Sequence, residues 1–588
     1  MTRRSVRIGN FSGYLGDRYT AIDEVMAGDQ VDVLMGDYLA EVTLAALAAG
    51  YRRDAGGGYV AYFLQQVRPH LAAIAERGVK VVTNAGGFDP AGLAEALRGL
   101  IAEAGVSLRV AHVEGDNVLD ELATYHAEGH GMEHLDTGAP LKDWGVEPIA
   151  ANAYLGGFGI AAALGAGADI VVTGRVTDAS LTAGPAAWWH GWTPDDYGPL
   201  AGAVTAGHII ECGAHATGGN FSGFRDVPGM LKPGFPIAEV AADGSSVITK
   251  HARDGGMVTV DTVTAQLVYE IQGPRYLNPD ATVHLETVQL SQVGTDRVAI
   301  APVAGSAPPP TAKVAVFAPI GYEISQMLFC TGPDVAVKVA LLRAQLRAQL
   351  EGYVDELDVT ALGTAAEDPA TQWEATVGIR VMATARDPEP LRRFAPAVGS
   401  LYLQGFPGFH HDGHAQRVSE PWSRIDYWPA LLPAELVPHR AVLDDGTVLE
   451  APVPSTSSVE PQPVQPEPPA PVTGGRRVPL GTLAHARSGD KGGNANVGIW
   501  VPAPDAWEWL RTTLSTEGIR ALLPEAKDLE IVRHEFPHLR AVHVVLKGLL
   551  GTGGSSNLRV DQIGKSVGEY LRSKHVTVPE ALLETARG

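Results

Sequence analysis

The sequence predicts an α/β protein: a mostly parallel sheet with flanking helices, then a second α+β domain, then a small C-terminal two-layer α/β sandwich. Over residues 1–234, short β-branched runs alternate with amphipathic segments, which is typical of stacked βαβ units. Over residues 235–450 the alternating apolar runs are longer. The Pro-rich segment 451–475 has too little apolar surface to form a core, so we expect a semi-extended linker before the last domain, residues 476–588.

The elements of the first domain follow from these patterns. The best-marked helix is 90–104, because Asp89 suits the N-cap, Pro90 the first helical position and Gly105 the residue after the end. The uncharged stretch 154–168 predicts a buried helix, since it is shorter than the roughly 20 residues that span a membrane. We expect strands at 6–8, 31–35, 80–83, 108–113 and 169–173, and further helices at 38–49 and 60–77.

The later domains are predicted from the same kinds of pattern. In the second domain we expect alternating, strand-like runs at 257–271 and 374–385, and a helix at 334–353. In the C-terminal domain we expect strands at 478–486, 495–501, 530–534 and 539–546, and a helix at 560–573.

The composition limits the partners. The chain has 588 residues and a formal charge of −22, which repels nucleic acid and anionic lipid surfaces. Its two cysteines, Cys212 and Cys330, cannot build a disulfide framework or a multi-Cys metal site. The first residues lack the apolar region of a signal peptide. We therefore expect a cytoplasmic protein without nucleic-acid or membrane partners, and Cys330, among apolar residues, in the core.

Polar residues beside glycine follow each expected strand of the first domain. Because the carboxyl ends of parallel strands meet at one edge, these residues predict a polar pocket there. Gly, Asn and Asp also favour ordinary turns, so plain βα connections are the alternative. The candidate side chains are Asp37, Glu41, Asn84, Glu114, Asp116, Arg175 and Asp178.

Two glycine-rich turns at this edge are candidates for binding an anion through backbone N–H groups, such as the phosphates of a nucleotide or of coenzyme A. The first turn contains Gly9 and Gly13, and the second contains Gly86 and Gly87. Neither matches a Walker or dinucleotide motif.

The segment 207–224, GHIIECGAHATGGNFSGF, is too rich in glycine for a plain helix or strand. It brings Cys212 close in sequence to His208, Glu211 and His215. A cysteine beside an imidazole can be a nucleophile, and it can equally line a pocket or fill a small apolar space, so all three interpretations stay open.

Two motifs resemble metal sites without meeting their requirements. His534–His538 reads HEFPH, but the HExxH motif needs a continuous helical turn and Pro537 interrupts it. The HHDGH sequence at 410–414 is flanked by glycine and has no evident fourth ligand, which favours a loop. We therefore expect no metal site.

A further anion site is a candidate in the C-terminal domain. The segment 484–494, AHARSGDKGGN, follows an expected strand and contains Arg487 and Lys491 among glycines. A wide turn with solvated charges is the alternative.

Several motifs together resemble the acyclic terpene utilisation protein AtuA family, long known as a domain of unknown function. They are MGDYLAEVTL, VVTNAGGFDP, VVTGRVTDASL, ECGAHATGGNFSGF, GFPIAEV and YEIQGPRYLNPD. The C-terminal LAHARSGDKGGNANVGIW resembles the small ferredoxin-like domain that accompanies this family, here fused through the linker. The resemblance implies catabolism of branched, terpenoid acids as coenzyme A thioesters, beside a biotin-dependent acyl-CoA carboxylase.

Chemistry next to a thioester carbonyl needs a base and a group that stabilises the enolate. The resemblance implies the class of substrate and no particular reaction, and our leading hypothesis is an acyl-CoA hydratase, lyase or acyl-transfer enzyme. Asp178 or Glu211 would act as the base, beside Asp37, with Asn84 and Arg175 as orienting or oxyanion-binding groups and Cys212 nearby. Gly9, Gly13, Gly86, Gly87, Arg487 and Lys491 would bind the coenzyme A portion.

Two other functions remain open: a non-catalytic protein that binds acyl-CoA or the carboxylase, and a hydrolase that uses a divalent metal. We expect no tightly bound cofactor, coenzyme A only as part of the substrate, and a homo-oligomer.

Overall fold

A computed structural model describes residues 3–51, 57–411, 420–471 and 474–585. The chain divides into two compact units. Unit 1 comprises residues 1–317, 427–554 and 561–588, and unit 2 comprises residues 318–426 and 555–560. Within unit 1 we call residues 3–317 and 427–450 the α/β body and residues 474–585, without 555–560, the C-terminal domain.

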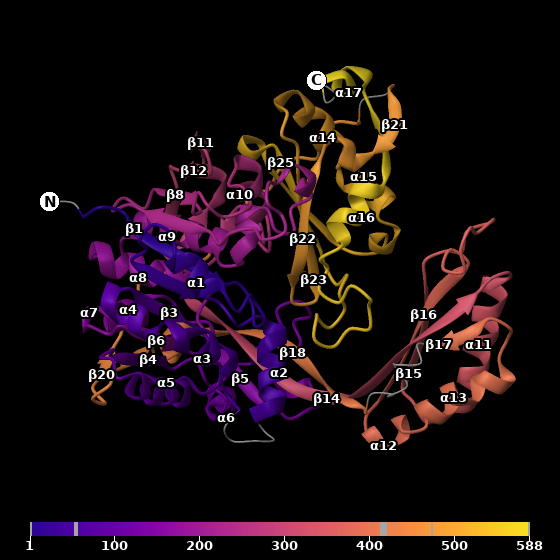
Figure 1. The fold of residues 1–588 in the computed structure, drawn as a ribbon, viewed down its shortest axis with the longest axis horizontal. Coiled ribbons are helices and arrows are strands. Elements are labelled where there is room, and N and C mark those ends of the chain that lie inside the picture. Colours follow the sequence, from indigo (N-terminus) through magenta and orange to yellow (C-terminus); the bar gives the residue numbers. More distant parts are fainter. Residues whose placement is uncertain (1–2, 52–56, 412–419, 472–473, 586–588) are drawn as a thin grey trace. The chain divides into compact units, whose positions relative to one another are not determined.

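The α/β body is built on an eleven-stranded sheet, in the order β11-β12-β8-β7-β1-β2-β3-β6-β4-β19-β20 (Figure 1). Its centre, β1-β2-β3-β6-β4, is parallel, and the strands on both sides are antiparallel. The bounds of the central strands are β1 Val6–Ser12, β2 Val33–Gly36, β3 Lys80–Thr83, β6 Ile170–Thr173 and β4 Val110–Glu114. The flanking strands are β7 Ile237–Val240, β8 Ser246–Thr249, β11 Leu290–Gly294, β12 Arg297–Ile300, β19 Arg440–Val442 and β20 Val448–Glu450.

The predicted parallel sheet is thus confirmed in its class and in its five central strands. These strands are buried almost throughout, as expected of a parallel sheet that has helices on both faces. A small sheet, β13-β10-β9, lies beside them in the same body. Its strands are β9 Arg275–Tyr276, β10 Thr282–His284 and β13 Ala304–Ser306.

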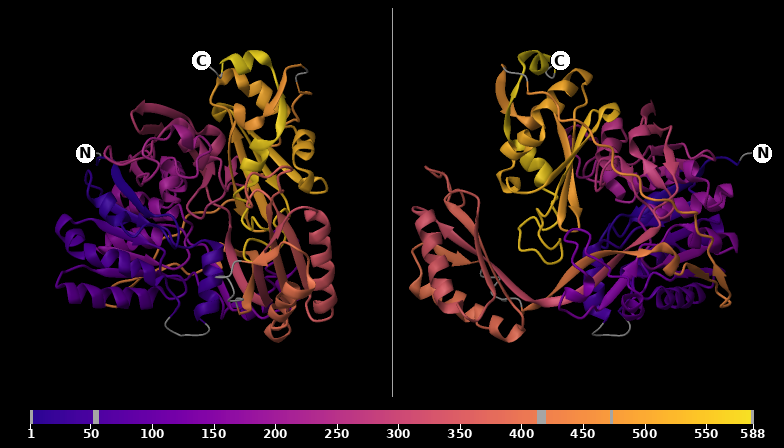
Figure 2. Two further views of the ribbon diagram at one scale, coloured as in Figure 1. Left: turned by 45° about the vertical axis from the view of Figure 1, so that its right-hand side comes forward. Right: turned by 180° about the vertical axis from the view of Figure 1, so that it is seen from behind.

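Helices form two layers around the central sheet (Figure 2). One layer contains α3 Ala61–Val67, α4 Leu71–Arg77 and α5 Pro90–Ala104, and the other contains α7 Phe158–Gly165, α8 Ser180–His190 and α9 Tyr197–Ile210. Helix α5 has the predicted bounds, and Asp89 accepts a hydrogen bond from the Gly92 N–H at its start. The other helices of the body are α1 Ala21–Met26, α2 Glu41–Tyr51, α6 Leu122–Ala127 and α10 Val260–Leu267.

Two element predictions in the α/β body were wrong. The alternating run 257–271 contains helix α10 rather than a strand, because Thr259 forms a capping box with Thr262 and starts a helix there. The expected helix 60–77 is broken into α3, a 3-10 turn at Arg68–His70 and α4, because Pro69 cannot continue the first helix.

The C-terminal domain has a four-stranded antiparallel sheet, in the order β22-β23-β25-β24. Its strands are β22 His485–Lys491, β23 Asn494–Trp500, β24 Ile531–Phe536 and β25 Ala541–Leu546, with a short pair β21 Arg476–Pro479 and β26 His575–Val578. Its helices are α14 Trp507–Thr513, α15 Thr516–Leu522, α16 Val567–Ser573 and α17 Glu580–Thr585. The segment 484–494, for which a loop after a strand was expected, is instead the β22–β23 hairpin.

Unit 2 is a sheet covered by helices on one face, visible in Figures 1 and 2. The long strand β14 (Thr311–Thr331) pairs with β16 (Thr376–Ala385), which lies at the predicted position, and with β17 (Phe409–His411). Buried Cys330 belongs to its core, as predicted. The remaining elements are β15 Glu356–Leu362, α11 Val335–Leu350, α12 Pro388–Leu391, α13 Phe394–Gln404 and β18 Trp422–Pro433. In unit 1, β14 also pairs with β5 (Ala150–Ala153).

None of the helices in the described ranges combines the length and the apolar character needed to cross a membrane.

Candidate functional site

Three neighbouring strands of the parallel sheet end in the polar groups that the sequence singled out. Asp37 follows β2, Asn84 follows β3, and Arg175 and Asp178 lie between β6 and helix α8. Because β2, β3 and β6 are adjacent and parallel, these residues meet at one edge of the sheet. The expected convergence of separate βα turns is therefore present.

Asp37 and Asn84 are held together by short hydrogen bonds. Asn84 donates through Nδ2 to Asp37 Oδ1 at 2.6 Å, and its Oδ1 accepts from the Tyr38 N–H at 2.7 Å. The Leu39 N–H also donates to Asp37 Oδ1, at 3.1 Å. Both polar groups of the Asn84 amide are used in this way, so Asn84 orients the carboxyl of Asp37.

Arg175 is the central cation of this edge, and its side chain is only 3% exposed. Its Nη1 donates to Asp178 Oδ1 at 2.7 Å and also to the carbonyl oxygen of Leu39. Its own backbone N–H donates to Asp116 Oδ2 at 2.7 Å. The guanidinium lies over the ring of Tyr154, 4.2 Å from the centroid. These contacts fix the guanidinium beside one face of Asp178.

Glu211 approaches from the end of helix α9, one turn after His208. The two side chains are almost fully buried, and His208 Nδ1 lies 3.4 Å from Glu211 Oε1. The other carboxyl oxygen of Glu211 has no hydrogen-bond partner within the described residues. An unpaired, buried carboxyl oxygen costs free energy, unless the group keeps its proton or a ligand contacts it.

The three carboxyl groups Asp37, Asp178 and Glu211, here called the acidic cluster, cannot all ionise together. Burial raises the pKa of each, and the negative charge of Asp178 raises the pKa of Asp37 and of Glu211 further. The positive charge of Arg175 lowers the pKa of all three carboxyl groups. The pKa values of Asp37 and Glu211 are raised more strongly than that of Asp178. Protonated and ionised carboxyl groups therefore coexist here at neutral pH.

A second set of groups borders the acidic cluster. Glu41 Oε1 accepts hydrogen bonds from Tyr154 at 2.7 Å and from Lys313 Nζ at 3.2 Å. Burial opposes ionisation of Glu41, but the charges of Lys313 and Arg175 outweigh it and lower its pKa. The Lys313 ammonium also lies over the ring of Tyr154, 4.5 Å from the centroid. Glu41 is therefore an ionised partner of Lys313.

The C-terminal domain reaches this edge through the β22–β23 hairpin, which extends toward the α/β body in Figure 1. Lys491, at the end of β22, donates to the carbonyl oxygen of Glu270 at 2.9 Å. Lys565 pairs with the Glu270 carboxylate at 3.0 Å. Glu270 has φ 52°, a conformation that non-glycine residues rarely adopt, and Asn496 accepts its N–H at 2.9 Å. The two domains thus build one site.

Five charged side chains at this edge remain partly exposed, and we call the place that they border the recess. The side chains of Glu41, Asp178, Glu270, Lys313 and Lys565 retain exposures of 29%, 31%, 27%, 26% and 31%. Desolvation nevertheless has the largest influence on the pKa of each of them. Solvent therefore reaches these side chains, although the surrounding protein removes much of the water around their charges. A substrate entering the recess would meet acids and bases together.

Cys212 lies beside this recess and is half-buried. Its backbone packs so closely on Gly13 that a Cβ at Gly13 would lie 2.5 Å from the Cys212 carbonyl carbon. Burial raises the pKa of the Cys212 thiol well above its ordinary value, and the charge of Glu211 adds to the shift. The site therefore favours the thiol over the reactive thiolate.

The backbone N–H groups of the glycine turns are already paired. Gly13 donates to Asp17 at 3.0 Å, Gly86 to the Thr173 carbonyl at 3.0 Å and Gly87 to the Asn84 carbonyl at 3.3 Å. Gly9 lies inside β1, where it pairs with Leu34 of β2. In this structure the glycines close and pack the turns.

Glu114, at the end of β4, and Asp116, just after it, do not belong to the acidic cluster. Glu114 lies 3.5 Å from Arg440. Asp116 accepts from Asn152 Nδ2 at 2.8 Å as well as from the Arg175 N–H, and burial raises its pKa to about 6. Asp116 thus holds the backbone of Arg175 rather than lining the recess.

The metal-like motifs do not form ligand clusters in the described chain. His534 lies in strand β24, which supports the expectation that HEFPH is no helical metal motif. His410 and His411 lie in β17, and the rest of HHDGH falls outside the described residues. No group of three or more His, Cys, Asp or Glu side chains in the described ranges is arranged to hold a metal ion.

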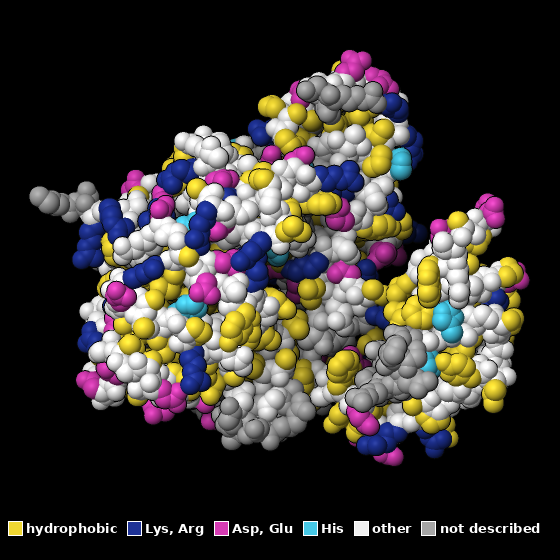
Figure 3. Space-filling model, viewed as in Figure 1, with side chains coloured by type: hydrophobic (Ala, Val, Ile, Leu, Met, Phe, Trp, Pro, Cys, Tyr) yellow, Lys and Arg dark blue, Asp and Glu magenta, His cyan; other side chains and the backbone are white. Residues whose placement is uncertain are grey.

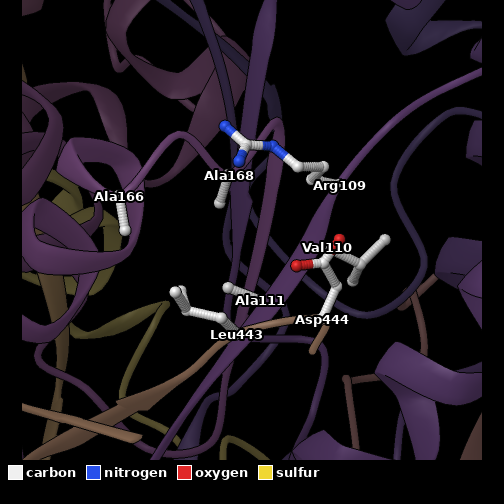
Figure 4. A pocket seen from close by; sticks show the side chains of 7 residues that line it. All are labelled: Arg109, Val110, Ala111, Ala166, Ala168, Leu443 and Asp444. Atoms are coloured by element: carbon white, nitrogen blue, oxygen red, sulfur yellow. The ribbon is translucent and has the colours of Figure 1, made fainter. Parts of the chain in front are cut away.

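A small cavity at the opposite end of the strands is separate from the site. It is lined by Arg109, Val110, Ala168 and Asp444 among others, as Figure 4 shows, and its volume is about 10 Å³. That volume suffices for about one water molecule. Over the face in Figure 3, basic and acidic side chains are interspersed, so that face has no extended field of one sign.

Sequence reasoning missed several groups of the recess. Tyr154, Lys313, Glu270 and Lys565 come from parts of the chain that were not expected at this edge. The motif 269–280 was quoted only for the family resemblance, although Tyr269 and Glu270 begin it. An acidic residue directly after a tyrosine in that motif was a usable signal.

Sequence comparison agrees with the motifs. The profile described as "Acyclic terpene utilisation family protein AtuA" matches residues 6–443. The chain belongs to this family. The profile of the AtuA ferredoxin-like domain matches residues 478–577, so the fused second module expected from the sequence is confirmed. The AtuA family profile thus covers every residue of the acidic cluster, and the ferredoxin-like module carries Arg487, Lys491 and Lys565. No curated protein and no solved structure matches the chain.

Proposed function

We propose that this AtuA family protein is an enzyme of branched or terpenoid acyl-CoA catabolism that transfers protons next to the thioester carbonyl, as a hydratase or lyase does. The observation that carries the proposal is the acidic cluster beside Arg175. Carboxyl groups with separated pKa values supply a general acid and a general base in the same recess. Membership of the family supports the class of substrate.

The roles follow from the contacts. Asp178 is the group exposed to the recess and paired with Arg175, which favours its ionised form, so it serves as the base. Glu211, whose pKa burial raises strongly, keeps a proton and serves as the acid. Asp37, oriented by Asn84, is the neighbour that keeps the cluster from ionising completely.

In a hydration or its reverse, the base removes a proton from water or from the carbon next to the thioester carbonyl. In hydration the hydroxyl group bonds to the carbon one further from the carbonyl, and the acid gives its proton to the carbon next to the carbonyl. In the reverse reaction the acid protonates the departing hydroxyl group, which leaves as water. Negative charge develops on the thioester oxygen meanwhile and needs a cation or N–H donors. Arg175 is fixed beside Asp178 and lies close enough to serve this purpose.

Hydrogen exchange tests the proposal without knowledge of the complete reaction. The purified full chain is incubated in D₂O with isovaleryl-CoA and with 3-methylcrotonyl-CoA, and deuterium in the acyl group is measured by mass spectrometry. Wild-type protein should incorporate deuterium, and Asp178→Asn should reduce the rate at least about a hundredfold. Absence of exchange and of turnover over a broad panel of acyl-CoA thioesters contradicts an enzyme of this class.

Binding without exchange would instead favour the alternative that the protein is a non-catalytic acyl-CoA-binding partner of a carboxylase. That alternative predicts that the purified full chain elutes together with an acyl-CoA carboxylase and that the chain by itself converts no acyl-CoA thioester.

A further inference from the structure

The C-terminal domain presents two cations on one face of a strand. Arg487, Gly489 and Lys491 alternate along β22, so they share a face. This face meets Tyr269 and Glu270. The Arg487 guanidinium lies 4.4 Å from the centroid of the Tyr269 ring, and Lys491 donates to Glu270. A Cβ at Gly489 would lie 2.6 Å from the Tyr269 ring, so glycine permits the close approach.

Arg487 is a buried charge whose hydrogen bonds go to neutral groups. Its Nη2 donates to His215 Nδ1 at 2.6 Å and its Nη1 to the Asn220 carbonyl at 3.4 Å. Burial and the nearby charge of Arg487 lower the pKa of His215 far below its ordinary value, so that imidazole is neutral. The Arg487 Nε has no partner among the described residues. A guanidinium stays charged, and a buried charge without an anion is unfavourable.

Lys491 is likewise bonded to a neutral atom, the carbonyl oxygen of Glu270. An ammonium has three N–H donors, so this bond leaves donors for another partner. The Glu270 carboxylate itself pairs with Lys565. The positive charge of Lys491 lowers the pKa of Asp178 and of Glu211. This ammonium therefore lies near the acidic cluster.

The carboxyl groups near these cations are either paired with another lysine or shifted toward the protonated form. Glu41 and Glu270 are ionised, but Glu41 pairs with Lys313 and Glu270 with Lys565. Burial raises the pKa of Asp490 to about 7, and it raises the pKa of Asp37 and of Glu211 well above the ordinary value. Within the described chain, Arg487 and Lys491 therefore lie where an additional negative charge is stabilised.

We propose that Arg487 and Lys491 bind a free carboxylate on the acyl group of the substrate, so that the enzyme takes dicarboxylic acyl thioesters. This specificity rests on the proposed function, because it assumes a coenzyme A thioester. The subsite lies beside the groups that would react with the acyl part. The phosphates of coenzyme A lie at the far end of a long pantetheine arm, which favours a carboxylate of the acyl group as the anion.

Calorimetric titration of the full chain with glutaryl-CoA, butyryl-CoA and free coenzyme A tests this specificity. Wild-type protein should bind glutaryl-CoA at least about tenfold more tightly than butyryl-CoA. Arg487→Gln and, separately, Lys491→Gln should remove that preference and leave the Kd for butyryl-CoA within about twofold. Arg511→Gln, which removes an arginine that is ion-paired with Glu535 in the same domain, should keep the preference.

Two results overturn the proposal. Equal weakening of all three ligands in Arg487→Gln assigns the subsite to a phosphate of coenzyme A. An unchanged preference in both variants assigns the two cations a purely structural role. A thermal-unfolding curve of each variant shows whether it is folded, and Lys491→Gln keeps the test decisive if Arg487→Gln is not.

Failure of the proposed function is recognised separately. If no thioester binds, free glutarate, butyrate and inorganic phosphate are titrated instead. If wild-type protein binds glutarate and Arg487→Gln does not, the carboxylate subsite is supported, although the substrate is then not a thioester. Binding of phosphate in preference to glutarate, or of neither anion, overturns the subsite.

Discussion

Arg175 and Asp178 form an ion pair of 2.7 Å in which the guanidinium is buried and the carboxylate faces the recess. They lie three residues apart, between strand β6 and helix α8, so a single strand-to-helix connection supplies both charges. The pair joins the backbone of the sheet edge to the acidic cluster, because Arg175 also contacts Asp116 and Leu39.

This relationship makes Asp178→Asn the most informative single substitution. The amide keeps the shape and can still accept from Arg175, but it cannot take up a proton at neutral pH. We expect turnover of an acyl-CoA substrate to fall at least about a hundredfold, with the melting temperature changed by only a few degrees. Glu103→Gln, at an exposed ion pair with Arg68, should change neither quantity. Full activity of Asp178→Asn contradicts its role as the base.

Asn84→Ala removes both side-chain hydrogen bonds of Asn84, one of which orients Asp37. The buried Tyr38 N–H then loses its partner, and Asp37 Oδ1 keeps only the Leu39 N–H, so unfolding in urea should show a loss of about 1–3 kcal/mol. Asn117→Ala is the matched control, since its Oδ1 accepts only from an exposed Leu119 N–H and should cost below about 0.5 kcal/mol. Equal losses in the two variants would show that burial of the Asn84 network contributes no stability.

The buried histidines contribute stability that is lost in mild acid. Burial lowers the pKa of His208 to about 4, that of His439 to about 4 and that of His543 to about 3. In the unfolded chain each has a pKa near 6.5, so the unfolded state binds more protons between about pH 6.5 and 4. The stability that each of these histidines contributes is therefore full above about pH 6.5 and decreases below it, by about 1.4 kcal/mol per pH unit.

Urea unfolding curves measured between pH 7 and pH 4.5 check this dependence. His543→Leu should make it less steep, because the leucine does not titrate and the site is fully buried. His575→Leu, at an exposed position, should leave the steepness unchanged. Curves whose pH dependence is the same in wild type and in His543→Leu contradict the assignment of a neutral, buried imidazole at this position.

The Cys212 thiol should react slowly. Its pKa is raised by burial and by Glu211, so at pH 8 its thiolate fraction is well below that of a free cysteine. Alkylation by iodoacetamide, followed by mass spectrometry, should proceed at least about tenfold more slowly than alkylation of glutathione. Cys330 is buried, so its alkylation rate is the internal reference for a thiol that the reagent does not reach. Rapid and selective labelling of Cys212 would instead indicate an activated nucleophile.

Much of the α/β body could be predicted from the sequence, because its signals are local. Helix α5 has its cap, its proline and its final glycine within the sequence that forms it. The central strands are short β-branched runs that can be identified without knowledge of their partners. Helix α10 was mispredicted because its capping threonines occur in a run whose alternation resembles a strand.

The sequence by itself determined that Asp37, Asn84, Arg175 and Asp178 follow successive strands, and parallel strands bring such residues to one edge. Tertiary structure alone decided that Lys491 and Lys565 join them, since nothing local relates residue 270 to a hairpin more than two hundred residues later. It also decided which carboxyl groups keep their protons, because desolvation depends on everything packed around a group and not on its neighbours in sequence.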